Sequence, residues 1–133
     1  MTPALAALIF CTLFGGLAVF QLTLALGAPL GRFAWGGGHE RLPTALRIGS
    51  AISIALYALF CAIIAERAGL VALFPWSSVS EIGAWVVTGY LGLGIVMNAI
   101  SRSPYERYTM TPLIIVLFAM ASIVALSPAL PTP

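Results

Sequence analysis

The chain has 133 residues, of which 61% are hydrophobic and only 8% are charged. A soluble domain carries about 25% charged residues, so this composition predicts an integral membrane protein. The net charge of +2 is small and is divided among several loops, which excludes the clustered basic face of a nucleic-acid-binding protein. We therefore expect the chain to contact the lipid bilayer and not to bind nucleic acid.

Four apolar segments are each long enough to cross a bilayer, and we expect helices over residues 3–26, 43–67, 79–101 and 104–126. The first segment has no basic start and is longer than the apolar part of a signal peptide, so it is predicted to be a transmembrane helix. Short loops join the segments. Together they predict one domain, residues 1–133, folded as an all-α antiparallel bundle of four transmembrane helices.

Two stretches have the pattern of a capping box, in which a serine and a glutamate three residues later bond the first amides of a helix. Ser78 and Glu81 predict the start of the third helix, and Ser103 and Glu106 predict the start of the fourth. Pro112 either kinks the fourth helix or begins it. We favour the longer, kinked helix, because a helix that began at the proline would cover only about 23 Å. The tail beyond it is too rich in proline to continue it.

The first loop combines glycines with residues that favour the membrane interface. Gly36–Gly38 lacks the preceding strand and the following Lys-Ser/Thr pair of a phosphate-binding loop, so it is interpreted as a flexible turn. Arg32, Trp35 and Arg41 are expected to anchor this turn at the headgroups. His39 is interpreted as a solvated side chain of the loop.

The arginines are distributed unevenly between the two sides of the predicted bundle. The first and third loops lie on one side of the bundle, and with the adjoining helix ends they hold Arg32, Arg41, Arg47, Arg102 and Arg107. The opposite side, with the second loop, holds only Arg67. Cytoplasmic loops carry the excess of positive charge in membrane proteins. We therefore expect a multi-pass protein of the inner membrane, with loops one and three in the cytoplasm and both termini outside.

Helical spacing predicts the contact between the first two helices. One stripe contains Cys11, Phe14, Ala18, Gln21 and Ala25, and the other contains Arg47, Ser50, Ile54, Tyr57 and Cys61. In an antiparallel hairpin the numbers of facing residues sum to a constant, about 72 here, which pairs Cys11 with Cys61 and Gln21 with Ser50. The two cysteines are interpreted as small buried hydrophobes of this contact, because neither a Cys-x-x-Cys motif nor a metal-ligand spacing is present.

Polar residues of the apolar segments gather near the predicted cytoplasmic side, and the candidate cluster contains Gln21, Arg47, Ser50, Asn98 and Glu106. In one interpretation they form a polar vestibule that binds a solute, since polar groups inside a membrane are costly and often functional. In the other they make hydrogen bonds that hold the helices together, worth about 0.6 kcal/mol each. Within the cluster we expect Arg47 to face Glu106.

Several stretches resemble those of a group of small bacterial integral membrane proteins to which no activity is assigned. They are GAPLGRFAWGG after the first helix, Leu42-Pro43 with Arg47 at the second, and Asn98 followed by SRSPYER before the fourth. This resemblance implies a four-helix fold and a membrane location only. Small multidrug-resistance transporters have a similar size, but their defining carboxylate in the first helix is missing here.

Two hypotheses about function follow. The first is a non-enzymatic membrane subunit or interaction protein that binds a membrane-protein partner. The alternative is a small transporter or channel that acts as a homo-oligomer and uses the polar vestibule. An enzyme is not expected, because a chain with no Asp and one His cannot assemble a Ser-His-Asp triad, and the sequence has no cluster of metal ligands. No cofactor is expected.

Overall fold

The computed structural model describes residues 1–128, which contain four long helices and no strand. They are α1 (Pro3–Ala25), α2 (Thr44–Arg67), α3 (Ser77–Ala99) and α4 (Pro104–Ala125). Each has 22 to 24 residues and an apolar composition. At about 1.5 Å per residue such helices cover the hydrocarbon core of a bilayer, about 30 Å thick. The prediction of a four-helix membrane bundle is confirmed.

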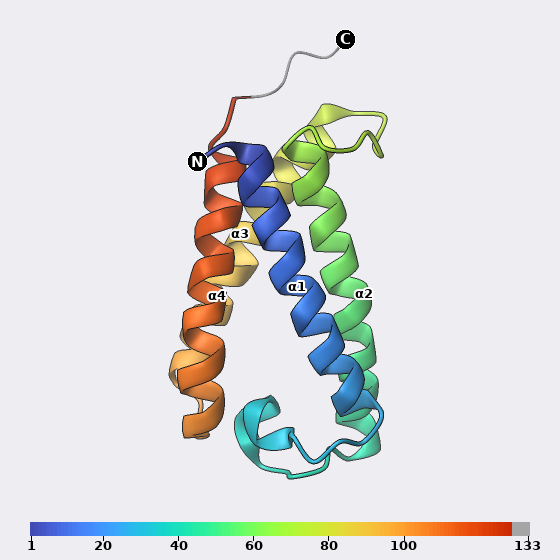
Figure 1. Ribbon diagram of the computed structural model, residues 1–133, viewed down its shortest axis with the longest axis vertical. Coiled ribbons are helices and arrows are strands. Elements are labelled where there is room, and N and C mark those ends of the chain that lie inside the picture. Colours follow the sequence, from blue (N-terminus) through green and yellow to red (C-terminus); the bar gives the residue numbers. More distant parts are fainter. Residues whose placement is uncertain (129–133) are drawn as a thin grey trace.

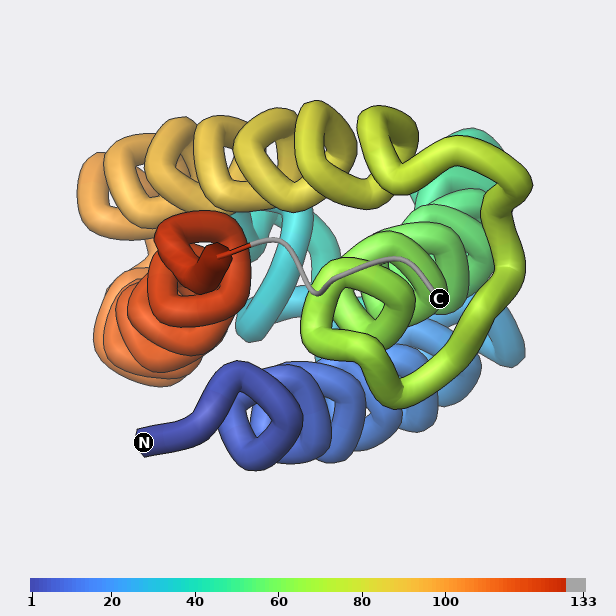
Figure 2. The backbone as a smooth tube through the Cα atoms, turned by 90° about the horizontal axis from the view of Figure 1, so that it is seen from above, coloured from blue at the N-terminus to red at the C-terminus, as the bar shows by residue number. Residues whose placement is uncertain are grey.

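The bundle consists of two antiparallel hairpins that splay apart. We call α1 with α2 the first hairpin and α3 with α4 the second hairpin. Figures 1 and 2 show that the hairpins approach each other at the end that holds the N-terminus and separate toward the opposite end, which we call the wide end. The segment between α1 and α2 folds back into the gap at the wide end (Figure 1). The two hairpins therefore diverge toward the wide end.

Small side chains allow the two hairpins to approach each other closely at the end opposite the wide end, which we call the narrow end. Ala6 and Ala7 of α1 and Ala121 and Ala125 of α4 are buried in the same core cluster. Without bulky side chains between them, the backbones of two membrane helices can come near each other. Farther along α1, the ring of Phe10 packs edge to face on a second phenylalanine, which begins the wider, aromatic part of the core.

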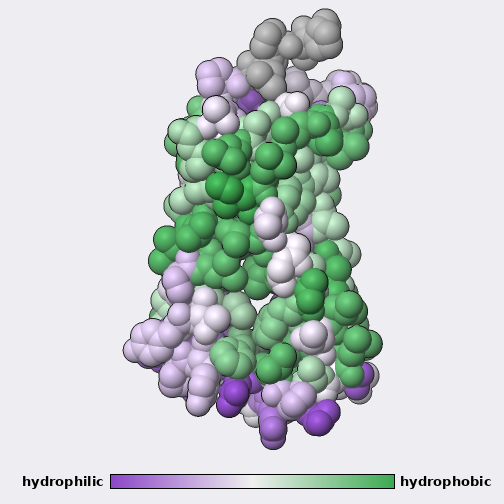
Figure 3. Space-filling view, viewed as in Figure 1, coloured by the Kyte–Doolittle hydropathy of each residue, from purple (hydrophilic) through white to green (hydrophobic). Residues whose placement is uncertain are grey.

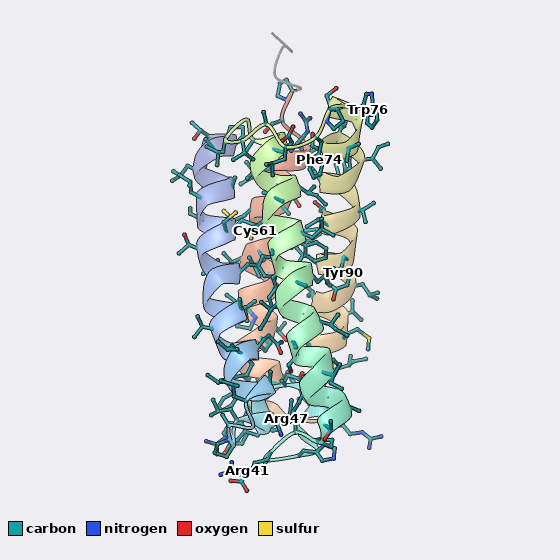
Figure 4. The ribbon with its side chains drawn as sticks, turned by 90° about the vertical axis from the view of Figure 1, so that its right-hand side faces the viewer. Arg41, Arg47, Cys61, Phe74, Trp76 and Tyr90 are labelled. Carbon is teal, nitrogen blue, oxygen red and sulfur yellow. The ribbon has the colours of Figure 1, made fainter. Side chains whose placement is uncertain are left out.

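Contacts inside the first hairpin follow the predicted register at several depths. The Cys11 thiol lies 3.8 Å from the carbonyl oxygen of Cys61. The rings of Phe14 and Tyr57 are 4.7 Å apart between centroids. At the wide end, Arg47 reaches the end of α1 (Figure 4). The pairing of Gln21 with Ser50, however, does not occur, because both side chains have other partners.

The two predicted capping boxes have different outcomes. The Ser103 hydroxyl accepts a bond of 3.4 Å from the Glu106 amide, as expected at the start of α4. The return bond does not form, because the Ser103 amide donates to the Ser101 hydroxyl and the Glu106 carboxylate has other partners. The box of Ser78 and Glu81 does not form, because α3 already begins at Ser77 and has no side-chain cap. The longer fourth helix is confirmed, since Pro112 lies inside α4. The expectation for the proline-rich tail falls largely on residues 129–133, which lie outside the described range.

Candidate functional site

The segment between α1 and α2 folds back between the two hairpins at the wide end of the bundle. Residues 31–37, which we call the wedge segment, make two short 3-10 turns, Gly31–Phe33 and Trp35–Gly37. The backbone is left-handed at Trp35, with φ 54°, and at the two glycines that follow. A tryptophan rarely adopts such a φ, so surrounding contacts must hold it there. The prediction of a flexible turn is therefore wrong for Trp35–Gly37, whereas its position at the headgroups stays a prediction.

The side chain of Trp35 attaches the wedge segment to the first hairpin. Its indole N–H donates to the hydroxyl of Ser50, at 3.1 Å. Its ring lies directly on Gly49, where a Cβ would be only 2.8 Å from the ring. Ser50 is fully buried and has no contact with water, so the indole N–H supplies its hydroxyl with a hydrogen-bond partner. A serine predicted to belong to the polar cluster thus fixes the loop.

Glu106 attaches the same segment to the second hairpin. One carboxylate oxygen, Oε2, accepts from the Gly36 amide at 3.0 Å and also from the Ser101 hydroxyl. The Ser103 hydroxyl adds a bond to the Arg32 carbonyl nearby. Gly37 packs so closely on Ser103 that a Cβ would clash, and its φ of 70° also favours glycine. The wedge segment is consequently held by both hairpins.

A cavity of about 700 Å³ lies between the two hairpins, on the side of the wedge segment that faces the narrow end. All of the long helices contribute to its wall, and the wedge segment closes it toward the wide end. Figure 3 shows a hollow in the surface at this level, below an apolar band that covers the middle of the molecule. Its apolar wall includes Phe14, Leu17, Phe20, Leu91, Met97, Met110, Ile114 and Leu117. The cavity is therefore a largely apolar chamber next to the wide end.

A few polar side chains interrupt this apolar wall. Gln21 donates to the Tyr57 hydroxyl at 3.2 Å, and its Oε1 is buried without a partner among residues 1–128. Asn98 donates to the carbonyl of Gly94, one turn earlier, at 2.8 Å. Glu106 is 9% exposed and also lines the cavity. The predicted residues Gln21, Asn98 and Glu106 are thus brought to one chamber.

Arg47 does not join them, and the predicted pairing with Glu106 is wrong. Its Nε donates to the carbonyl of Ala25 at 2.8 Å, and its guanidinium packs over Gly27. The last carbonyls of a helix have no partner within the helix and carry negative partial charge, so they attract a nearby arginine. Arg107 binds the Ser101 carbonyl, just beyond α3, in the same way, at 2.6 Å and 3.1 Å.

Aromatic residues of the wall were not predicted to belong to the site. Tyr57 lies on the stripe that suggested the hairpin contact, so its spacing already indicated an inward position. Tyr90 lies on the partly exposed side of α3 and reaches the cavity between α2 and α3, where it packs on Phe60 at 5.1 Å (Figure 4). Nothing in the local sequence distinguishes Tyr90 from a side chain that faces lipid.

Comparisons with protein-family models, with curated proteins and with solved structures find no significant match to this chain. The four apolar helices define the class, a multi-pass membrane protein, and the resemblance to a group of small bacterial membrane proteins stays a prediction.

Proposed function

We propose that this membrane protein is a non-enzymatic binding protein for a small amphipathic molecule, which occupies the cavity between the two hairpins. The observation that carries the proposal is the chamber of about 700 Å³ with its apolar wall and few polar side chains. Sites for small molecules are commonly about 300–1,000 Å³ in volume, mostly apolar, with a small number of polar groups that orient the ligand.

The position of the chamber favours a ligand that enters from the bilayer. The hairpins separate at this level, whereas the wedge segment covers the chamber toward the wide end (Figures 1 and 3). An apolar tail can then lie among side chains such as Leu17, Met110 and Ile114. The polar part of the ligand can meet Gln21 and Asn98. Of the two hypotheses from the sequence, this arrangement is nearer to the transporter or channel, which also requires a site for a solute, than to the interaction subunit. The chamber differs from the expected polar vestibule in being largely apolar.

A chain-length series of linear alcohols tests the proposal. The protein is reconstituted in phosphatidylcholine nanodiscs, and binding is measured by calorimetry against empty nanodiscs. Each added CH₂ contributes about 0.8 kcal/mol while it is buried in the chamber, so affinity should rise with length and then stop rising once the chamber is full. Partition into lipid alone has no such limit. A series without saturable binding would refute the proposal.

A matched pair of glycine variants locates the binding. Gly94 lines the cavity, and a Cβ there would make ordinary contact with Ile114 at 3.6 Å. Gly89 lies on the same helix with nothing within 4 Å and is not part of the cavity wall. Gly94→Leu should shorten the chain length at which affinity stops rising, whereas Gly89→Leu should leave it unchanged. Equal effects of the two variants would place the binding outside the chamber.

A further inference from the structure

We infer that the chamber binds an amphipathic amine in its protonated form, with the ammonium group bound by Glu106. This inference rests on the proposed function and adds the chemical class of the ligand's polar group. The sequence suggested a solute site without a chemical class, and it assigned the Glu106 carboxylate to Arg47. The structure leaves part of that carboxylate free.

One oxygen of Glu106 is engaged and the other is free. Oε2 takes both hydrogen bonds, from the Gly36 amide and from the Ser101 hydroxyl. Oε1 has no hydrogen-bond partner among residues 1–128, and the surrounding atoms do not seal it off. The side chain as a whole is only 9% exposed and lines the cavity. A free acceptor on a carboxylate that is nine-tenths buried favours a ligand that donates a hydrogen bond.

The donors that hold this carboxylate are neutral, so its charge is not compensated by direct contact. A buried charge without an opposite charge beside it is costly, and a bound cation would offset that cost. Gln21 also lines the cavity, and its amide already donates to the Tyr57 hydroxyl. The inner polar atoms of the chamber therefore match a cation that carries N–H donors better than an anion.

The arginines at the wide end do not occupy this position. Arg47 and Arg107 are turned to the carbonyls of Ala25 and Ser101. Arg102 also lines the cavity, but its side chain is exposed, so its charge is solvated at the rim. An anionic head group would have to stay at this rim, whereas a cationic one can reach the inner carboxylate.

Aromatic rings in the wall suit the same ligand. Phe14, Tyr57 and Tyr90 all face the chamber. The faces of aromatic rings attract a cation within about 6 Å, and this attraction is stronger where water is excluded. The rings also pack against an apolar tail, so they fit both halves of an amphipathic amine.

Three probes with one dodecyl chain and different head groups test the inference. Dodecylamine, dodecanol and dodecanoic acid are titrated into the protein in phosphatidylcholine nanodiscs at about pH 8, where the amine is a cation and the acid an anion. We expect the amine to bind about tenfold or more tighter than the alcohol, since hydrogen bonds to charged groups are the stronger ones. The acid should bind weakest.

Variants tie the preference to the carboxylate. Glu106→Gln keeps an acceptor for the Gly36 amide and should lower the ratio of amine affinity to alcohol affinity about 10- to 100-fold, a ratio that a general loosening of the chamber would not change. Glu40→Gln, an exposed change between the wedge segment and α2, is the matched control and should change neither. Arg102→Gln should not weaken amine binding. If Glu106→Gln does not fold, the ranking of the three probes on the unmodified protein still decides.

The possible failures are distinguishable. Equal affinities for the three probes, or tighter binding of the acid that is lost in Arg102→Gln, would overturn the ammonium site and leave the amphipathic chamber intact. Saturable binding of none of them would overturn the proposed function itself.

Discussion

The carboxylate of Glu106, in the first turn of α4, accepts a hydrogen bond of 3.0 Å from the backbone amide of Gly36, 70 residues earlier in the chain. Because Trp35, the preceding residue, is bonded to Ser50 of α2, two adjacent residues of the wedge segment connect the hairpins where they are farthest apart. These bonds therefore link the two hairpins across the wide end, next to the cavity.

The separate roles of Glu106 and Arg47 predict additive effects on stability. Glu106→Gln and Arg47→Gln each weaken a different contact, the wedge segment in one case and the end of α1 in the other. Each should cost about 1–3 kcal/mol, as for other hydrogen bonds to charged groups. The double variant should equal the sum within about 0.5 kcal/mol in detergent unfolding. A larger coupling energy would support the ion pair between Arg47 and Glu106 that the sequence suggested.

Removing the indole N–H of Trp35 should expose the cost of the buried Ser50 hydroxyl. Trp35→Phe is expected to lower the free energy of unfolding by about 1–3 kcal/mol, because the hydroxyl loses its donor. Adding Ser50→Ala should recover part of this loss, since the stranded polar group is then removed. Unfolding in detergent, followed by circular dichroism, measures both. Trp76→Phe, at a residue that is 68% exposed, serves as the control and should have little effect.

Cys11 and Cys61 should form an intramolecular cross-link under a mild oxidant. The Cys11 thiol already lies 3.8 Å from the Cys61 carbonyl oxygen, and both thiols are free. Cross-linking requires Cα atoms within about 7 Å. A mobility shift in a denaturing gel that disappears in Cys11→Ala would support the contact. Products that are exclusively dimers would contradict it.

The orientation in the membrane stays a prediction from the arginine distribution. In a variant without native cysteines, Gly38→Cys, at the wide end, should be shielded from an impermeant thiol reagent in intact cells. Gly38 is exposed and has open space around it. Ala72→Cys, in the exposed loop between α2 and α3, should react. The reversed labelling pattern would place the wide end outside the cell.

The arginines on which the predicted orientation rests also have structural contacts. Arg41 and Arg47 lie at the wide end, and Phe74 and Trp76 lie at the opposite end (Figure 4). The side chains of Arg41 and Arg47 bind carbonyls at the end of α1, so the same residues that mark the predicted cytoplasmic side also complete a helix terminus. Charge counting alone could not separate these roles.

The sequence by itself determined the class of protein and the helices. Each of the four observed helices begins and ends within two residues of its predicted bounds. This success has a simple cause: a membrane-spanning segment must satisfy its backbone internally and present apolar side chains over a known length, so length and composition suffice. The register of the first hairpin was also accessible, because the position of a residue on a helix face depends only on its spacing.

The tertiary structure alone decided which polar groups meet. Gln21, Asn98 and Glu106 lie on three different helices, and their shared chamber depends on the angle between two hairpins, which no local pattern contains. The partner of Arg47 is a backbone carbonyl, an acceptor that every residue carries and that composition therefore cannot identify. The wedge segment was missed for a related reason. Its left-handed backbone is held on both sides by Ser50 and Glu106, which are distant from it in sequence.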